Sequence, residues 1–205
     1  TRWLFGSPHI VTGSSVDLLG VYQRYHFFAQ SKIVRLENPR TIPFTSRTHI
    51  EKTGEIRFLF VGQIESHKGI EALLTAAVEV RAQLQQQGVS LRLDIVGDGT
   101  LKESLMVMYA KHSYIQWYGK LDRQDIEKRY EDTDVFVVPS LCYENTPSVV
   151  YEAFSFSLPV IVSDSTGLSE MVEQGVTGLV CAVGQQYDLV RTLVRYATDR
   201  ELRQS

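Results

Sequence analysis

The chain contains 205 residues with a mass of 23.3 kDa, a length that suits one domain or two small ones. Its hydrophobic share of 43% and charged share of 22% are those of an ordinary globular protein, which excludes a disordered tail, a collagen-like fibre and a disulfide-stapled miniprotein. A net charge of −3 without clustered lysines and arginines argues against nucleic acid as the main partner.

Cysteine usage and hydropathy bear on the cell compartment. Cys142 and Cys181 lie in apolar sequence without metal-ligand spacing, which predicts two reduced core residues. The longest apolar stretches are too short to cross a bilayer, and the first ten residues lack the apolar core of a signal peptide. We therefore expect a soluble, cytoplasmic protein. Because the chain begins at Thr1 without a methionine, we also expect that an upstream segment is missing.

The first 50 residues predict a β–α–β piece followed by a linker. HIVTGSS (9–15) predicts a strand that enters a Ser-capped helix, and KIVRLENP (32–39) predicts a second strand. The polar segment that follows contains two prolines and no periodicity, as a linker or hinge would. Residues 1–50 are too short for a domain, so we interpret them as the tail end of a preceding domain plus an interdomain linker.

From residue 51 onward, short β-branched runs alternate with segments of helical period. Strands are expected at 56–62, 91–97, 114–119, 134–139, 159–163 and 178–182. Helices are expected at 69–87, from about 100, and at 123–131, 147–157, 168–174 and 186–198. Because the strands are rich in Val and Ile without strict polar alternation and a helix follows each, residues 51–205 predict an α/β domain with a Rossmann-like, doubly wound parallel sheet.

The loop and helix after the fourth of these strands predict a phosphate site. Thr146 is expected to be the N-cap and Pro147 the first helical residue. The backbone N–H groups of Ser148 and Val149 would then lack intrahelical acceptors and point out of the positive end of the helix dipole. This end would lie beyond the carboxyl end of a parallel strand, where open α/β sheets bind their ligands.

Two glutamates flank that helix end. Glu152 is one turn deeper on the face of Ser148, where its carboxylate could accept hydrogen bonds from a ribose diol. Glu144, in the preceding loop, would lie beside whatever the phosphates carry. The alternative interpretation is a capped, buried helix with two solvated glutamates.

A second candidate feature follows the first strand of this half. Gly62 permits a close backbone turn at the strand end, and the Lys68 ammonium precedes a helix at Gly69, where it could reach a diphosphate. The alternative is a surface lysine after an ordinary glycine turn. Gly97 begins a tight turn expected to line the ligand cleft. It does not begin a dinucleotide fingerprint, because Lys102 stands where the third glycine would be.

Other catalytic patterns are absent from the sequence. There is no G-x-S-x-G elbow and no Walker pattern, and the five histidines are scattered, which argues against a metal site. Backbone groups near Gly119, Lys120 and Leu121 could face a nucleobase.

The ordered segments together carry a resemblance. The spacing of Glu144 and Glu152 is that of the E-x7-E signature of retaining glycosyltransferases of the family 4 type (group 1), which have the GT-B fold. VGQIESHKGIEALL, LDIVGDGTLKESL, YEDTDVFVVPS and SLPVIVSDSTGLSEMVEQGVTGLV are similar to successive family segments, in the same order. The resemblance covers residues 54–200, and it favours the ligand-binding interpretations over the alternatives.

The resemblance implies that residues 51–205 are the nucleotide-sugar-binding, Rossmann-like domain of such an enzyme. Glu144 would contact the sugar hydroxyls and Glu152 the ribose, Lys68 would neutralise the leaving diphosphate, and Lys120 and Leu121 would lie near the base. The backbone of the intervening loop and helix end would bind the sugar and β-phosphate, through Asn145, Thr146, Pro147, Ser148 and Val149.

Two positions depart from the family pattern. Gln63, the residue after the strand-end Gly62, stands where the family commonly has an arginine and brings no charge, so Lys68 would carry more of the leaving-group stabilisation. Many members also have a glycine in the loop after the first glutamate, where this chain has Asn145, Thr146 and Pro147.

The implied function is the donor-binding half of a hexosyltransferase that uses a nucleoside diphosphate sugar, by family preference a UDP-sugar, without a metal or other cofactor. The saccharide or lipid-linked saccharide acceptor would bind through the missing N-terminal domain, so the isolated chain is expected to be inactive. Peripheral membrane association stays open. The alternatives are a non-catalytic nucleotide-sugar-binding module, a GT-B nucleotide-sugar epimerase and, less favoured, a dinucleotide-binding oxidoreductase domain.

Overall fold

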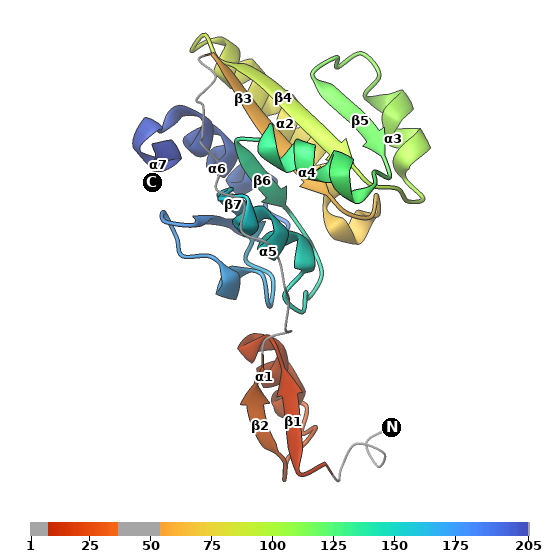
Figure 1. Cartoon of the computed structure of the whole chain (residues 1–205), viewed down its shortest axis with the longest axis vertical. Coiled ribbons are helices and arrows are strands. Elements are labelled where there is room, and N and C mark those ends of the chain that lie inside the picture. Colours follow the sequence, from red (N-terminus) through yellow and green to blue (C-terminus); the bar gives the residue numbers. More distant parts are fainter. Residues whose placement is uncertain (1–7, 37–53, 205) are drawn as a thin grey trace.

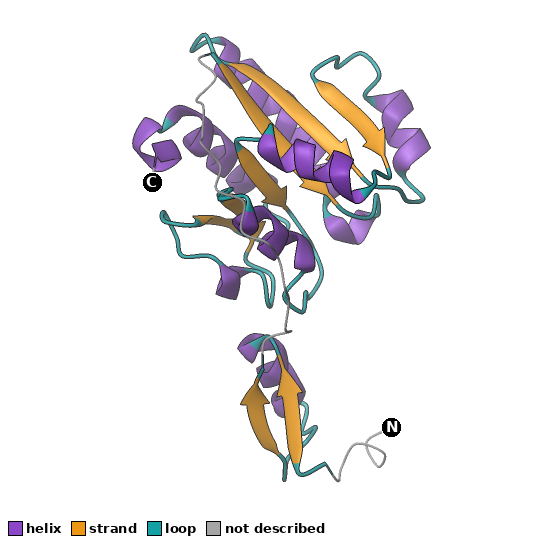
Figure 2. Cartoon of the chain, in the orientation of Figure 1, coloured by secondary structure: helices purple, strands orange, loops and turns teal. Residues whose placement is uncertain are grey.

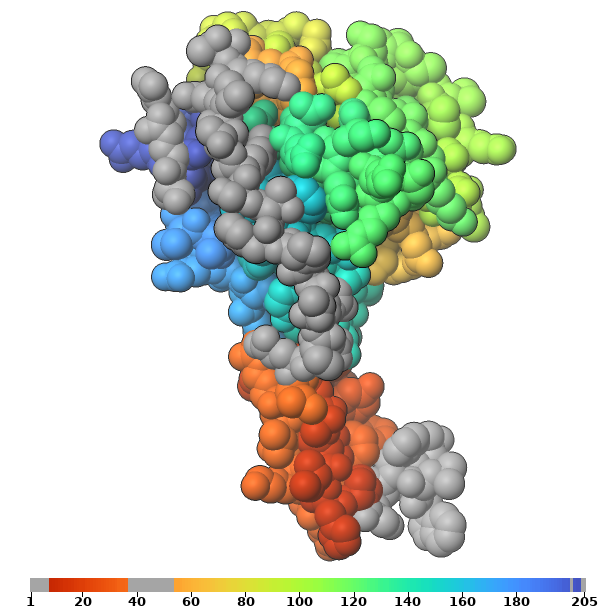
Figure 3. Space-filling view, viewed as in Figure 1, coloured from red at the N-terminus to blue at the C-terminus, as the bar shows by residue number. Residues whose placement is uncertain are grey.

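The computed structural model describes residues 8–36 and 54–204, which form two separate parallel sheets (Figures 1 and 2). The smaller sheet has two strands and belongs to the N-terminal segment. The larger has six strands and belongs to the rest of the chain. In the space-filling view the N-terminal segment projects from the larger α/β body (Figure 3).

The N-terminal segment is a β–α–β unit, as the sequence predicts. Strand β1 (Ile10–Gly13) leads into helix α1 (Val16–Arg24), and strand β2 (Lys32–Arg35) pairs with β1 in parallel. Ser15 is the N-cap of α1 and accepts a hydrogen bond from the backbone N–H of Leu18. The expected linker lies almost wholly outside the described residues, and the division into residues 1–50 and 51–205 stays a prediction.

The large sheet has the strand order β5–β4–β3–β6–β7–β8, and every neighbouring pair is parallel. Its strands are β3 (Glu55–Val61), β4 (Ser90–Val96), β5 (Ile115–Gly119), β6 (Val135–Val138), β7 (Val160–Ser163) and β8 (Gly178–Cys181). All six fall where the sequence predicts them. The order reverses between β3 and β6, and such a switch point is where doubly wound sheets place their ligands.

Helices cover both faces of this sheet. They are α2 (Ile70–Gln85), α3 (Lys102–Met108), α4 (Arg123–Glu131), α5 (Ser148–Ser155), α6 (Gln186–Thr198) and α7 (Arg200–Gln204). In β6, Val135 and Val137 pack in a core with α2, α3 and α6, whereas Phe136 and Val138 pack in a core with α4 and α5. Both sets of side chains are buried, which explains why the strands are continuously apolar.

Three elements differ from expectation. The helix expected at 168–174 is only a 3-10 turn, η2 (Ser169–Met171), because Val172 already has extended backbone angles. The sequence did not predict α7. Helix α5 begins at Ser148 with Pro147 as its N-cap, so the expectation of Thr146 as N-cap and Pro147 as first helical residue is wrong. No helix in the described ranges is long and apolar enough to cross a membrane.

Candidate functional site

The loops after β3 and β6 lie against each other at the switch point. The backbone N–H of Leu141 donates to the carbonyl of His67 at 2.9 Å. Lys68 ends a 3-10 turn, η1 (Ser66–Lys68), and Gly69 then adopts φ +72° before α2. A Cβ atom at Gly69 would lie 1.9 Å from the carbonyl oxygen of Pro139, so only glycine permits this approach. The left-handed turn at Gly69 therefore brings Lys68 to the neighbouring loop.

Lys68 and Glu144, which the sequence places in separate motifs, form an ion pair. Lys68 Nζ lies 2.6 Å from Glu144 Oε1, and their side chains are 25% and 12% exposed. Ser140 Oγ donates to the same oxygen at 2.8 Å. Burial is the largest influence on the pKa of Glu144 and raises it. The hydrogen bonds from Lys68 and Ser140 and the charge of Lys68 outweigh burial, so the pKa is lowered. Glu144 is therefore a carboxylate at neutral pH.

Cys142 belongs to this site. It is half-buried, and its Sγ lies 3.6 Å from Glu144 Oε1, so the expectation that it is a core residue is wrong. Cys181 is buried, as expected, and neither cysteine forms a disulfide.

A loop that sequence reasoning missed supports Glu144 from the other side. The backbone N–H of Glu144 donates to the carbonyl of Thr166 at 2.9 Å. Gly167 has φ +87°, and a Cβ atom there would lie 1.9 Å from the carbonyl oxygen of Glu144. The signal in the sequence is the isolated glycine after the fifth strand of the sheet, which marks a close backbone approach.

The N-terminus of α5 presents the expected donors. The first-turn amides of Ser148 and Val149 have no acceptor among the described residues, whereas Val150 already bonds to Pro147. Thr146 is 1% exposed and adopts φ +45°, an uncommon angle for a β-branched residue. Its hydroxyl donates to Ser14 of the N-terminal unit at 2.7 Å. Thr146 therefore uses its hydroxyl in a long-range contact and not in a cap.

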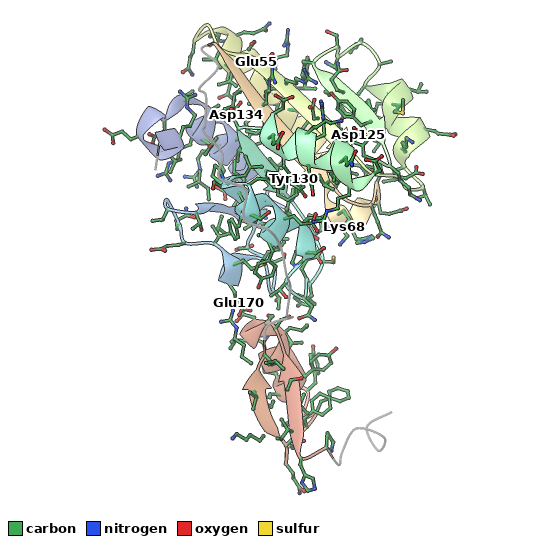
Figure 4. The ribbon with its side chains drawn as sticks, viewed as in Figure 1. Glu55, Lys68, Asp125, Tyr130, Asp134 and Glu170 are labelled. Carbon is green, nitrogen blue, oxygen red and sulfur yellow. The ribbon has the colours of Figure 1, made fainter. Side chains whose placement is uncertain are left out.

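Glu152 lies in α5 at the expected depth. Its Oε2 accepts a hydrogen bond from the hydroxyl of Tyr130 at 3.3 Å, and Tyr130 is fully buried (Figure 4). Burial, and then the charge of Glu152, raises the pKa of Tyr130, so its phenol stays protonated as a donor. Glu152 thus pairs with Tyr130 of α4, whereas Glu144 pairs with Lys68, so the two glutamates have different partners.

The remaining predicted residues lie along the same edge of the sheet, at the ends of β3, β4 and β5. Gly62 donates its N–H to Val96 at 3.0 Å, and Gly97 donates its own to Gly119 at 2.8 Å. Gly97 has φ +139°, and a Cβ atom there would lie 1.8 Å from the carbonyl oxygen of Gly62. The loops after β3, β4 and β5 are thus neighbours in space. Gln63 follows Gly62, and Lys120 and Leu121 follow Gly119.

This arrangement can bind an anion that carries hydroxyl groups. An ammonium and the free amides of a helix N-terminus each attract phosphate oxygens, and carboxylates can accept hydrogen bonds from sugar hydroxyls. No cluster of three His, Cys, Asp or Glu side chains suited to a metal occurs in the described ranges.

Comparison with known proteins identifies the family. The family described as Glycosyl transferases group 1 matches residues 42–205, four fifths of the chain. The chain belongs to this glycosyltransferase family.

Individual curated proteins resemble this chain over about two thirds of its length. The chain is 28% identical over 148 residues to the amylovoran biosynthesis glycosyltransferase AmsK of Erwinia amylovora, a match that covers 68% of this chain and 35% of AmsK. It is 31% identical over 143 residues to a glycogen synthase of Mycobacterium tuberculosis, which covers 68% of this chain and 33% of that enzyme. The match thus spans about a third of each relative's length.

Solved structures show the fold. The apo form of the lipopolysaccharide outer core galactosyltransferase WaaB superposes with a TM-score of 0.79 at 22% identity, covering 93% of this chain and 53% of WaaB. The Anabaena protein HepE, solved with UDP-glucose, superposes with a TM-score of 0.78 at 16% identity, covering 98% of this chain and 57% of HepE. The α/β fold of this glycosyltransferase chain is therefore that of one part of GT-B enzymes, as predicted.

Proposed function

We propose that this chain binds the nucleotide-sugar donor of a retaining glycosyltransferase that transfers a hexose to a saccharide acceptor, in polysaccharide or glycoconjugate synthesis. The supporting observation is the ion pair of Lys68 and Glu144 at the switch point of the sheet, with Glu144 in the loop that leads into the N-terminus of α5. A UDP-sugar is the proposed donor, because similar structures were solved with UDP-glucose in HepE and with UDP and GlcNAc in GtfA.

Each part of the donor has a proposed partner. The Lys68 ammonium and the amides of Ser148 and Val149 hold the diphosphate by charge and by donated hydrogen bonds. Glu144 accepts hydrogen bonds from the sugar, and Glu152 accepts them from the ribose. The base lies toward the ends of β4 and β5, near Lys120 and Leu121.

The proposed reaction needs no metal or other cofactor. The acceptor hydroxyl attacks the anomeric carbon from the face that the diphosphate occupies, while the bond from that carbon to the β-phosphate oxygen breaks. The diphosphate leaves with the bonding electron pair, and its oxygen takes the acceptor proton. Glu144 positions the sugar and stabilises its developing positive charge. Lys68 and the helix end stabilise the departing negative charge, a contribution made larger because Gln63 carries none.

The acceptor has no proposed site within residues 51–205. We assign it to a preceding domain, of which residues 1–50 would be the end, and we expect this chain alone to bind donor but to transfer little. This proposal treats residues 51–205 as the donor domain of the longer enzyme.

Calorimetric titration of the chain with UDP, UDP-glucose, GDP and NAD tests the function. We expect UDP and UDP-glucose to bind with micromolar to millimolar affinity and NAD not to bind. Glu152→Ala should weaken UDP binding about tenfold or more, because it removes hydrogen bonds to a charged group. Glu131→Ala is the matched control, since Glu131 lies exposed at the end of α4.

Three results would contradict parts of the proposal. Failure of the wild-type chain to bind any uridine nucleotide would contradict the donor site. Equal loss of affinity in Glu152→Ala and Glu131→Ala would contradict the ribose assignment. Robust sugar transfer by the 205-residue chain would contradict the assignment of the acceptor to another domain.

A further inference from the structure

The carboxylate of Glu170 binds the N-terminus of α1, although the two lie more than 150 positions apart in the sequence. Glu170 Oε2 accepts the backbone N–H of Val16 at 2.9 Å, and Oε1 accepts that of Asp17 at 3.0 Å. Oε1 also accepts the hydroxyl of Ser15 at 2.5 Å. Glu170 lies in η2, on the α/β body, at its junction with the N-terminal unit (Figure 4).

These bonds complete the helix end. Ser15 Oγ accepts the N–H of Leu18, so Ser15 and Glu170 together satisfy the three amides of the first turn. The negative carboxylate also lies at the positive end of the α1 dipole. Ser15 is fully buried. The carboxylate of Glu170 belongs to the α/β body, whereas α1 belongs to the N-terminal unit. Because Glu170 completes the N-terminus of α1, it fixes the position of the β1–α1–β2 unit against the body.

The residue before this cap contacts the candidate site directly. Ser14 is 2% exposed, and its hydroxyl donates to Asn145 Oδ1 at 2.6 Å while it accepts from Thr146 Oγ1 at 2.7 Å. Asn145 and Thr146 immediately follow Glu144. Thr146 also has the left-handed φ of +45°, a conformation that persists in a β-branched residue only when its surroundings fix it. The hydroxyl of Ser14 supplies two of the contacts that do so.

We propose that Glu170 and Ser14 are positioning residues for the donor loop. Glu170 seats the N-terminus of α1, and this seating places Ser14 between Asn145 and Thr146, which sets the backbone that follows Glu144. The inference rests on the proposed function, because this backbone is the segment proposed to hold the sugar and β-phosphate. It extends that function by assigning part of the site's geometry to a unit outside residues 51–205.

Amide hydrogen exchange and NMR spectra of the 205-residue chain test the contact without any ligand. We expect Glu170→Ala to speed exchange of the Val16 and Asp17 amides about tenfold, since each loses a charged acceptor. Glu170→Gln should show a smaller effect because it keeps an acceptor oxygen. Glu173→Gln is the matched control, because Glu173 is an exposed neighbour whose side chain has no partner in the described ranges.

The same spectra test whether the contact reaches the loop. The Asn145 side-chain amide and the Thr146 signals should shift in Glu170→Ala as they do in Ser14→Ala, and the double variant should shift them no further. Unchanged exchange at Val16 and Asp17 in Glu170→Ala would overturn the seating. Shifts at Thr146 in Ser14→Ala alone would overturn the coupling between Glu170 and the loop. Amide signals of the six-stranded sheet verify that each variant is folded.

Calorimetry then tests the positioning of the donor. Ser14→Ala and Glu170→Ala should weaken UDP-glucose binding more than UDP binding, because the loop would contact the sugar. Unchanged affinity for both nucleotides in both variants would overturn the positioning role. Failure of the wild-type chain to bind either nucleotide would count against the proposed function instead, whereas the exchange rates and chemical shifts would still decide the Glu170 contact.

Discussion

Lys68 Nζ lies 2.6 Å from Glu144 Oε1, although the two residues are 76 positions apart and belong to loops after different strands. Strand order explains the contact, because β3 and β6 are neighbours at the switch point. The pair also explains how a carboxylate stays ionised in a half-buried loop. A donor diphosphate that enters this site meets an ammonium that is already paired, so binding must exchange one anionic partner for another.

Lys68→Met should therefore weaken UDP binding roughly tenfold to a hundredfold, because a hydrogen bond between charged groups is worth about 1.5 to 3 kcal/mol. The same substitution removes the influences that lower the pKa of Glu144 most, so burial should then raise that pKa. Calorimetry measures the first effect and an NMR titration of the Glu144 carboxyl carbon the second. Lys128→Ala, which removes an exposed lysine of α4, is the control for loss of positive charge. Equal weakening in both variants would contradict a specific role for Lys68.

Much of the fold follows from local sequence. The strands of the large sheet are rich in β-branched residues, and β6 and β7 are apolar on both faces, so they are distinct from the helical segments between them. Helix α6 spans the expected 186–198, because its apolar residues recur at helical spacing. Lys68 and Glu144 could be named from sequence because each lies in the segment between a strand of the parallel sheet and the helix that follows it.

Some features of the site depend on contacts between residues far apart in the sequence, and local sequence patterns did not predict these features. Thr146 has the chemistry of an N-cap, yet Ser14 binds its hydroxyl and Pro147 becomes the cap. Neither Ser14 nor Glu170 carries a local signal for its role, since each acts on a segment more than 130 positions away. Gly167 carried such a signal, but its partner, the carbonyl of Glu144, becomes evident only in the folded chain.

Gly167→Ala should destabilise the chain and disturb the site, whereas Gly175→Ala should only destabilise it. The two glycines have similar φ angles, +87° and +81°, so each substitution pays the same left-handed strain of about 1 to 2 kcal/mol. At Gly175 the added methyl meets nothing within 4 Å, whereas at Gly167 it lies 1.9 Å from the Glu144 carbonyl oxygen. Displacing that loop should cost about 1 to 3 kcal/mol more.

Urea unfolding of both variants measures this difference, and calorimetry with UDP-glucose measures its effect on the site. We expect only Gly167→Ala to lose affinity for the nucleotide sugar. Equal free energies of unfolding for the two variants would show that the Glu144 loop moves away from the added methyl group at no cost. That result would contradict the steric conflict expected between position 167 and the Glu144 carbonyl.

The two thiols should differ in reactivity. Burial, and then the charges of Asp188 and Asp164, raises the pKa of Cys181 to about 12, so this thiol should resist alkylation at pH 8. Cys142 is half-buried beside Glu144 and should react. UDP-glucose should slow its modification if the sugar occupies the Glu144 loop. Mass spectrometry of iodoacetamide-treated chain, with and without the nucleotide sugar, measures both. Alkylation of Cys142 at the same rate under saturating UDP-glucose would place the sugar elsewhere.

The seating of α1 should weaken in acid. Burial is the largest influence on the pKa of Glu170 and raises it, but hydrogen bonds from Ser15, Val16 and Asp17 and the charge of Arg35 lower it below its ordinary value of 4.5. A carboxyl whose pKa is lower in the folded state adds stability that is complete above its unfolded pKa. That stability is lost as the pH falls through the folded pKa, so the contact should persist above pH 4.5 and weaken only below it.

Chemical shifts of the Val16 and Asp17 amides between pH 7 and pH 3 follow this loss. They should stay constant to pH 4.5 and then move together with the Thr146 signals, because the loop depends on the same contact. Asp17 is a second carboxylic acid beside the contact, so Glu170→Gln is the necessary control: it keeps Asp17 but has no carboxyl at position 170. If the Thr146 signals titrate equally in Glu170→Gln, the acid transition belongs to another group, and Glu170 does not control the loop.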